Sequence, residues 1–416
     1  MPASAKKSRA FQHRHYELAK PPISNDSRLI IMKSPSYQWR EISLAESYKL
    51  RALAILIIIV HNFLHLVMET PSENEFSYSV EKYRAFVDGL WSTPADCVRI
   101  IFSYLGHYGV QVFFFLSGYA AALKLSHNQS SSSSQNQDNN QIKTPPSWWS
   151  FVRRRLLSLY PAIIIASIGL LGYFSYHYGF VKTVTEDGVD LLRQMSGLSN
   201  FYPDNVYHPI GPWWFIGVIL QFYLIVPLLY KLPFMNKDKR PLILGGIALS
   251  SLLLEYFFAD TFRHLTDCNF NHCILGHLDI CALGMLAAHY KKISIPLWIF
   301  ALALLLFNVG NWYATMWIAA AFWMTILLAP LLRIMADKLS KIDLLNNALL
   351  YIGQISIYIF LCNGYLRQPL LDRPEADPLW WKSIYYCLLF VIVTICWAAV
   401  SHWIDQKIRK HLGSKN

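Results

Sequence analysis

The chain has 416 residues, of which 54% are hydrophobic and only 15% are charged, whereas about 25% of the residues of an ordinary soluble domain are charged. This composition excludes an ordinary soluble enzyme. The formal net charge of +11 comes from 37 Lys and Arg against 26 Asp and Glu, a surplus that favours nucleic-acid binding in soluble proteins but cytoplasmic loops in membrane proteins. We therefore expect a protein of the lipid bilayer that binds no nucleic acid.

Long uncharged segments recur along the chain, and each is about long enough to cross a bilayer as a helix. With ten crossings, most of the 37 basic residues fall in segments on the side of both termini, and the acidic residues cluster on the other side. This pattern predicts an all-α, polytopic membrane helix bundle with both termini cytoplasmic, most simply in the plasma membrane. The predicted spans lie near residues 51–68, 100–124, 156–178, 213–231, 241–259, 272–290, 294–310, 312–332, 346–366 and 380–402.

Polar, basic segments flank this predicted transmembrane domain, which we place at residues 46–404. Residues 1–45 are expected to be a disordered basic arm, and residues 405–416 a basic cytoplasmic tail. A low-complexity cytoplasmic loop rich in Ser, Gln and Asn is expected at 126–146. No apolar stretch precedes a cleavage site in the first 50 residues, so we expect the first span to act as the insertion signal.

The first span carries an arginine at its entrance and two histidines further in. His61 lies about 15 Å past Arg51 along a helix, and His65 roughly 6 Å further. The two histidines are four residues apart and share a helix face. Because a neutral imidazole can take a proton from a hydroxyl, we expect Arg51, His61 and His65 to be catalytic. The structural alternative is a histidine that only bonds a neighbouring helix.

The second predicted span, "GVQVFFFLSGYAAAL", has small residues within a bulky aromatic run. Ser117 and Gly118 are typical of close helix packing. Gln111, in the same helix, needs a hydrogen-bond partner.

Three consecutive arginines, Arg153, Arg154 and Arg155, stand where the third span begins. Guanidinium groups at this position suit the phosphates of a large anionic cofactor arriving from the cytosol. A role in fixing the membrane orientation of the helix, or contact with lipid headgroups, explains the three arginines equally well.

The sixth predicted span, "HCILGHLDICALG", brings histidines, cysteines and a carboxylate together. Their spacing matches no familiar zinc pattern, so we expect no metal. Asp279 is expected to be a buried carboxylate that pairs with a basic or hydroxyl group of another helix.

Five segments in order resemble the motifs of one family. They are Arg51 with a histidine downstream, "GVQVFFFLSGY", "FVRRRLLSLYP", "WWFIGVILQFYLIVPLL" and "GQISIYIFLCNGYLRQPLL". Together, over about residues 48–403, they resemble acyltransferase family 3, integral membrane enzymes that O-acylate extracytoplasmic glycans.

The sequence departs from that family pattern at several positions. The family histidine usually stands eleven residues after the arginine, where this chain has Asn62, so His61 and His65 both remain candidates for the base. Asn363 stands where the family pattern has the histidine of the late segment. Ser158 stands where the pattern has the last arginine before "YP". The acidic pair of the fourth span is replaced by Ile219 and Leu220.

The resemblance implies an acyl-CoA-dependent O-acyltransferase that moves an acyl group, most simply acetyl, to a hydroxyl of a cell-surface or lipid-linked glycan. Acyl-CoA is then a co-substrate, and no tightly bound cofactor is expected. Arg51 would share the CoA phosphates with the three consecutive arginines. The residues expected to line the cofactor path are Arg153, Arg154, Arg155, Ser117 and Gln111.

Substrate contacts are expected from aromatic and polar residues of later spans. Aromatic side chains stack on sugar rings, although aromatic belts at membrane interfaces give the same pattern. The residues expected at the acceptor are Trp213, Trp214, Tyr223, Asn363 and Asp279.

Two other functions remain compatible with the sequence. A transporter or flippase of a glycan or small solute would use the buried His, Arg and Asp residues for binding or proton coupling. A catalytically silent acyl-CoA or lipid sensor would keep the arginine cluster without needing the histidines.

Overall fold

The computed structural model describes residues 35–67, 73–130, 147–202, 206–229, 238–371 and 380–413. The chain divides into two units, Met1–Pro35 and Ser36–Asn416, and only the second is described below. Most of the predicted arm and of the low-complexity loop, and the last three residues of the tail, lie outside the described residues.

The described unit is almost entirely helical, which confirms the predicted all-α fold. Apolar segments form helices because a backbone in lipid must satisfy its own hydrogen bonds. The longer helices are α1 (Leu44–Val67), α4 (Gly109–Ser130), α5 (Trp148–Tyr178), α8 (Trp214–Leu229), α9 (Arg240–Thr266), α10 (Leu278–His289), α11 (Leu297–Trp312), α13 (Ala320–Leu339), α14 (Asp343–Gln354), α15 (Ser356–Leu366) and α17 (Trp380–Gly413).

Shorter elements connect them. These are β1 (Ser36–Arg40), α2 (Val80–Ser92), η1 (Pro94–Asp96), α3 (Cys97–Leu105), η2 (Gly106–Tyr108), α6 (Phe180–Glu186), α7 (Gly188–Ser196), η3 (Ser199–Phe201), η5 (Gly211–Trp213), η6 (Phe270–His272), η7 (Ile274–His277), β2 (Lys292–Pro296), α12 (Ala314–Trp317) and α16 (Gln368–Leu371).

Among the described residues, seven helices are long and apolar enough to cross a membrane, and α14 with α15 adds an eighth if their 76° bend is one broken span. The helical stretches Ile274–His289 and Leu297–Trp312 are apolar but shorter. Every predicted span thus overlaps an apolar helical segment, although the predicted span 312–332 is displaced from α13, which covers Ala320–Leu339. The count of ten crossings itself stays a prediction.

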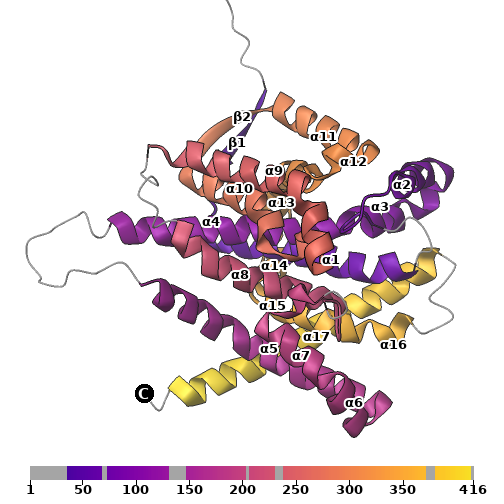
Figure 1. Cartoon of the computed structure of the whole chain (residues 1–416). Coiled ribbons are helices and arrows are strands. Elements are labelled where there is room, and N and C mark those ends of the chain that lie inside the picture. Colours follow the sequence, from indigo (N-terminus) through magenta and orange to yellow (C-terminus); the bar gives the residue numbers. More distant parts are fainter. Residues whose placement is uncertain are drawn as a thin grey trace, which may run out of the picture. The chain divides into compact units, whose positions relative to one another are not determined.

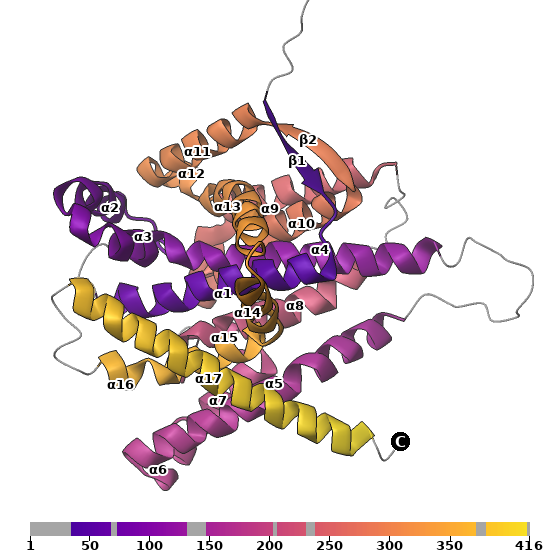
Figure 2. The ribbon, with the colours of Figure 1, turned by 180° about the vertical axis from the view of Figure 1, so that it is seen from behind.

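The helices run back and forth between two ends of the bundle. In Figure 1 the last turn of α4, the first turn of α5 and the C-terminal turn of α17 lie on the left, while α2, α6 and α16 lie on the right. Figure 2 shows the same arrangement from behind, with the sides exchanged. The two groups of connections therefore occupy opposite ends, as helices that alternate in direction require.

Helix α4 lies between α1 and α10 and packs against both. Two glycines bring α4 and α10 into backbone contact. A Cβ atom on Gly118 would meet the Cys281 carbonyl, and one on Gly284 would meet the Phe115 carbonyl. The small residues of the second span therefore serve helix packing.

The structured unit begins ten residues before the predicted boundary at residue 46. Strand β1 pairs antiparallel with β2, with Trp39 opposite Ile293. The Arg333 guanidinium lies over the Trp39 ring and donates to the backbone carbonyls of Arg40 and Glu41 and to Glu46. Long-range pairing and one buried arginine thus order a segment whose polar composition predicted disorder.

Candidate active site

The larger cavity opens among α1, α4, α5, α8 and the bent pair α14–α15, and has a volume of about 310 Å³. We call it the Arg51 cavity. Its lining residues are Tyr48, Arg51, Ile58, Val110, Phe113, Leu116, Ser117, Arg155, Ser158, Leu159, Phe215, Ile219, Tyr223, Gln354, Ser356, Ile357 and Phe360.

Two guanidinium groups face this cavity. Arg155 lies 5.4 Å from the Tyr223 ring centroid, and Arg51 lies 6.0 Å from that of Tyr48. Within the described part of the chain, no carboxylate lies within ion-pair distance of Arg51 or Arg155. Two such cations in one cavity make it a site for an anion.

The predicted arginine cluster is divided by the geometry of α5. Arg155 lines the cavity, whereas Arg153 and Arg154 are exposed, and Arg154 donates to the Ser150 carbonyl. Consecutive residues on a helix point about 100° apart, so three neighbours cannot all face one cavity.

The bend between α14 and α15 adds polar groups to the same cavity. Gln354 ends α14 and Ser356 begins α15, and both line the wall. The first turn of α15 carries the partial positive charge of a helix N-terminus. Gln354 and Ser356 were not predicted from the sequence, because an apolar run gives no signal of a 76° break within it.

Three histidines meet further along α1. The ring centroids of His61 and His65 are 4.6 Å apart, and those of His61 and His107 are 5.7 Å apart. His61 Nδ1 lies 3.0 Å from the Phe102 carbonyl oxygen, and His65 Nδ1 lies 2.7 Å from that of His61. Carbonyl oxygens only accept, so both Nδ1 atoms carry the hydrogen and both Nε2 atoms keep a lone pair.

A carboxylate completes this group, which we call the histidine cluster. His61, His65 and Glu73 each bring one ligand-type atom within 4.8 Å of the others. Such a set can hold a metal ion. However, the two imidazole planes are stacked at 13°, so their lone pairs lie in two nearly parallel planes and do not both point at one tetrahedral ion. The arrangement suits proton transfer better than metal binding.

The two positions where the family pattern has histidines hold asparagines that bond each other. Asn62 Nδ2 donates to Asn363 Oδ1 at 2.8 Å, and Asn363 is fully buried. Arg367 donates to the Asn62 carbonyl. An amide pair cannot accept a proton at physiological pH, so a base has to come from the neighbouring histidines.

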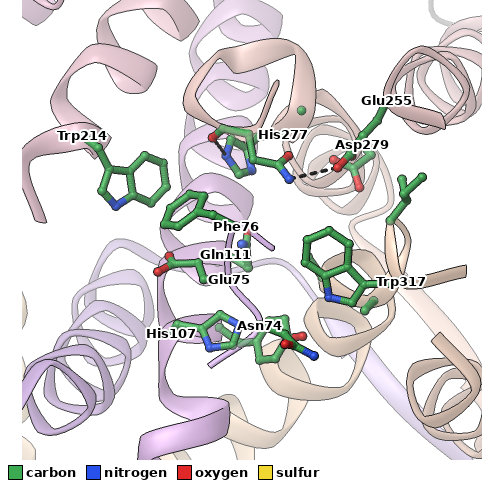
Figure 3. Close-up of a pocket in the computed structure, with 16 residues that line it drawn as sticks. Asn74, Glu75, Phe76, His107, Gln111, Trp214, Glu255, His277, Asp279 and Trp317 are labelled. Carbon is green, nitrogen blue, oxygen red and sulfur yellow. Dashed lines mark hydrogen bonds between the residues drawn. The ribbon is translucent and has the colours of Figure 1, made fainter. Parts of the chain in front are cut away.

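A second, smaller cavity of about 40 Å³ lies on the other face of α4 (Figure 3). We call it the Asp279 cavity. Its lining residues are Asn74, Glu75, Phe76, His107, Tyr108, Gln111, Trp214, Glu255, Asn271, Gly276, His277, Asp279, Trp317, Ile318, Ala320 and Ala321.

Polar groups of this cavity are held by local hydrogen bonds or left without a partner. Asn271 Nδ2 donates to Glu255 Oε1, and His277 Nε2 lies 2.9 Å from the Asn271 carbonyl oxygen. Gln111 Oε1 and Asp279 Oδ1 are buried and have no hydrogen-bond partner in the described structure. Asp279 therefore lacks, at Oδ1, the interhelical partner that the sequence suggested.

The structure divides the predicted substrate residues among several places. Trp214 and Asp279 line the Asp279 cavity, together with Gln111, which was predicted on the cofactor path. Tyr223 lines the Arg51 cavity. Trp213 is buried in packing and donates to the Leu361 carbonyl, so it faces neither cavity.

Two acidic residues of the Asp279 cavity, Glu255 and Glu75, were not predicted from the sequence. Glu255 is a carboxylate inside a long apolar run, which is itself a signal of function in a membrane helix. Glu75 follows α1 in a polar loop and carries no such signal. Burial raises the pKa of Glu75 well above its ordinary value, and the neighbouring Glu73 carboxylate raises it further.

The two cavities share no lining residue. On α4, Val110, Phe113 and Ser117 face the Arg51 cavity, whereas Gln111 faces the Asp279 cavity. The histidine cluster adjoins the second cavity through His107, which lines it.

Comparison with known proteins gives one match. The family model described as "Acyltransferase domain" matches residues 50–403. No curated protein and no solved structure matches the chain.

Proposed function

We propose a reaction from one premise: the chain belongs to this acyltransferase family and is a multi-pass membrane acyltransferase. The donor is an acyl-CoA, most simply acetyl-CoA, that enters the Arg51 cavity from the cytoplasm. The acceptor is a hydroxyl of a cell-surface or lipid-linked glycan that reaches the Asp279 cavity from the opposite side.

The observation that carries this proposal is that two guanidinium groups face the Arg51 cavity and that neither forms an ion pair within the described residues. CoA carries phosphates, and arginine binds phosphate through paired, charge-assisted hydrogen bonds. The positive-inside rule places the same end of the bundle in the cytoplasm, where acyl-CoA is made. Ser117, Ser356 and Gln354 supply hydroxyl and amide groups for the polar pantetheine arm.

The acceptor oxygen attacks the thioester carbonyl in the proposed reaction. The new ester C–O bond forms, the C–S bond breaks, and the products are the acylated glycan and free CoA. The acceptor proton passes through a histidine to the leaving thiolate. We assign this role to His61, because its Nε2 atom keeps a lone pair and its ring centroid lies 4.6 Å from that of His65 and 5.7 Å from that of His107.

Glu73, the glutamate of the histidine cluster, is proposed to assist His61. Glu73 Oε2 is buried without a hydrogen-bond partner in the described structure and lies in the cluster with His65. A carboxylate beside an imidazole stabilises the protonated ring. His65 and Glu73 are therefore proposed to stabilise the charge that His61 acquires.

The proposal is tested by release of free CoA from purified protein in nanodiscs, given acetyl-CoA and a mixed glycan extract. Loss of a general base costs about 10²–10⁴ in rate, so we expect His61→Gln to lower CoA release at least a hundredfold and His65→Gln less. His264→Gln, on an exposed face of α9, is the matched control and is expected to keep full activity.

Release that persists in the His61→Gln protein would contradict the assigned base. An intact protein that releases no CoA with any acyl-CoA and any extract would contradict the proposed reaction.

A further inference from the structure

We propose that the Asp279 cavity selects an acceptor saccharide that carries a protonated primary amine. This inference rests on the proposed function and names the class of acceptor: an amino sugar with a free ammonium group. The observation behind it is a cavity lined by three acidic residues, Glu75, Glu255 and Asp279, and by no lysine or arginine (Figure 3). We assign the ammonium group to Glu255 and Asp279.

Two of these carboxylates are deeply buried. Asp279 is 3% exposed and Glu255 is 6% exposed. Glu255 receives one hydrogen bond, from the neutral amide of Asn271. Buried carboxylates are normally paired with a cation, and in the described ranges no lysine or arginine forms an ion pair with any of the three.

The polar atoms left without partners specify the complementary ligand. Gln111 Oε1 and Asp279 Oδ1 are both acceptors, and both residues are at least nine-tenths buried. A ligand that satisfies them has to donate hydrogen bonds. An ammonium group has three N–H donors and a positive charge, whereas a carboxylate or phosphate has neither.

The cavity volume limits how much of the ligand enters. About 40 Å³ is room for roughly three water molecules, at about 10–15 Å³ each. One functional group therefore fits, and a pyranose ring has to remain at the mouth.

Aromatic side chains line the same cavity. Phe76 and Trp214 form an edge-to-face pair with centroids 5.1 Å apart, and Trp317 stands on another wall. Aromatic faces attract cations and stack on apolar ring surfaces. An amino sugar offers both features, since its ring carries the ammonium group.

The test compares three acceptors of equal length with the purified protein in nanodiscs and acetyl-CoA. They are glucosamine oligomers, glucose oligomers and galacturonate oligomers. Free CoA and acylated product are measured together. We expect kcat/KM for the glucosamine oligomer to exceed that for the glucose oligomer at least tenfold, and the galacturonate oligomer to be the poorest acceptor.

Variants locate the preference. Asp279→Asn and Glu255→Gln are each expected to reduce the glucosamine-to-glucose ratio at least fivefold. The matched control is Asp260→Asn, which neutralises an exposed carboxylate on the same helix as Glu255 and is expected to keep the ratio. A binding measurement without turnover, tryptophan fluorescence during titration with glucosamine or glucose, covers variants that lose activity.

Several outcomes would overturn the inference. Equal use of the glucosamine and glucose oligomers would do so, as would an unchanged ratio in both folded variants. Stimulation of transfer to the glucose oligomer by NaCl would assign the carboxylates to an inorganic cation instead. Failure to release CoA with all three acceptors and with the mixed glycan extract would contradict the proposed function rather than this preference.

Discussion

Arg155 and Arg153 are chemically identical and two residues apart, yet only Arg155 faces the Arg51 cavity. Its guanidinium packs between the rings of Phe151 and Tyr223, at 5.3 and 5.4 Å from their centroids. Such stacking holds the planar group in one orientation and leaves its edge available for an anion. Position on the helix therefore decides which arginine faces the cavity.

We expect Arg155→Gln to raise the KM for acetyl-CoA roughly tenfold or more, because a hydrogen bond to a charged group contributes about 1.5–3 kcal/mol. Arg153→Gln, which changes an exposed side chain, is the matched control and is expected to change KM less than about twofold. Initial rates of CoA release at varied acetyl-CoA make the comparison. Equal effects of the two substitutions would indicate a general attraction by surface charge.

Glu75 predicts a pH dependence of stability. Its pKa in the folded protein is raised, chiefly by burial, so above about pH 4.5 the unfolded chain has lost a proton that the folded chain still holds. Stability from this group is therefore present at low pH and decreases as the pH rises through the folded pKa. Glu75→Gln removes the effect, so its melting temperature relative to the unchanged protein should increase from pH 5 to pH 8.

Thermal unfolding in detergent at several pH values measures this difference. Glu81→Gln, which changes an exposed carboxylate on α2, serves as the control and should show a constant difference in melting temperature. A constant difference for Glu75→Gln as well would show that Glu75 is ionised in the folded protein.

The individual residues of the site were predictable where chemistry and sequence position coincide. Arg51 and the two histidines stand out because charged and ionisable groups are costly in an apolar span. The sequence did not predict which of Arg153, Arg154 and Arg155 faces the cavity, because this depends on the rotation of α5 against its neighbours. His107 was missed because a lone histidine near a helix start has no distinguishing pattern.

The contact between α4 and α10 is made by glycine. Gly118 and Gly284 each lie against a backbone carbonyl of the other helix, where a Cβ atom has no space. The crossing brings the two helices that carry Gln111 and Asp279 together. This contact therefore helps to position two of the residues that line the Asp279 cavity.

We expect Gly284→Ala to destabilise the protein by roughly 1–3 kcal/mol or more, since backbone atoms cannot move aside as a side chain does. Gly245→Ala on α9 is the matched control, because a Cβ atom there meets nothing within 4 Å. That change should be neutral or stabilising by up to about 1 kcal/mol, through helix propensity. Melting temperatures in detergent test both, and similar values for the two variants would contradict the close contact.

Helix α5 contains Pro161, which has no backbone N–H to donate to the Leu157 carbonyl. Arg409 of α17 reaches this carbonyl at 3.5 Å and the Ser158 carbonyl at 3.3 Å. Arg409 also bonds the buried Asp405, whose other partner is the Tyr358 hydroxyl. The C-terminal helix thus stabilises the part of α5 that lines the Arg51 cavity.

Arg409→Met is expected to reduce stability by about 1–2 kcal/mol, because it leaves the Asp405 carboxylate buried with one partner. It should also raise the KM for acetyl-CoA, since Ser158 and Arg155 belong to the same stretch of α5. Lys410→Met, at the neighbouring exposed position, is the control for loss of charge. A KM unchanged by Arg409→Met would show that α5 keeps its shape without this support.

At the scale of elements, hydropathy was sufficient to locate the spans but not their interruptions. All ten predicted spans overlap apolar helical segments, because hydropathy is a local property. The 76° bend at Ile355 and the pairing of β1 with β2 depend on contacts between distant segments. A single sequence carries no signal for such contacts.

At the scale of the molecule, the two ends of the bundle differ in the chemistry that they present. The Arg51 cavity brings two guanidiniums together, and the Asp279 cavity brings three acidic residues together. The positive-inside rule assigns the first to the cytoplasm. This assignment predicts which connections are accessible from which side.

Single cysteines test this predicted topology, in a protein in which the seven native cysteines are replaced. Lys338→Cys, at the end of α13, should react with a membrane-impermeant thiol reagent only from the cytoplasmic side. Trp91→Cys, which lies 82% exposed on α2, should react only from the other side. Labelling of intact cells against inverted vesicles distinguishes the two, and labelling of both positions from one side would contradict the predicted topology.

The separation of the two cavities has an electrical consequence. An aqueous passage through the bundle would let protons and ions run down the gradients that a bilayer maintains, at about 2.3 kcal/mol per charge for each 100 mV. The two cavities share no lining residue, and α4 lies between them, because Ser117 and Gln111 of this helix face different cavities. Because the proposed reaction needs the acceptor oxygen to reach the thioester, the path between the cavities has to admit the reacting groups without opening a continuous column of water across the membrane.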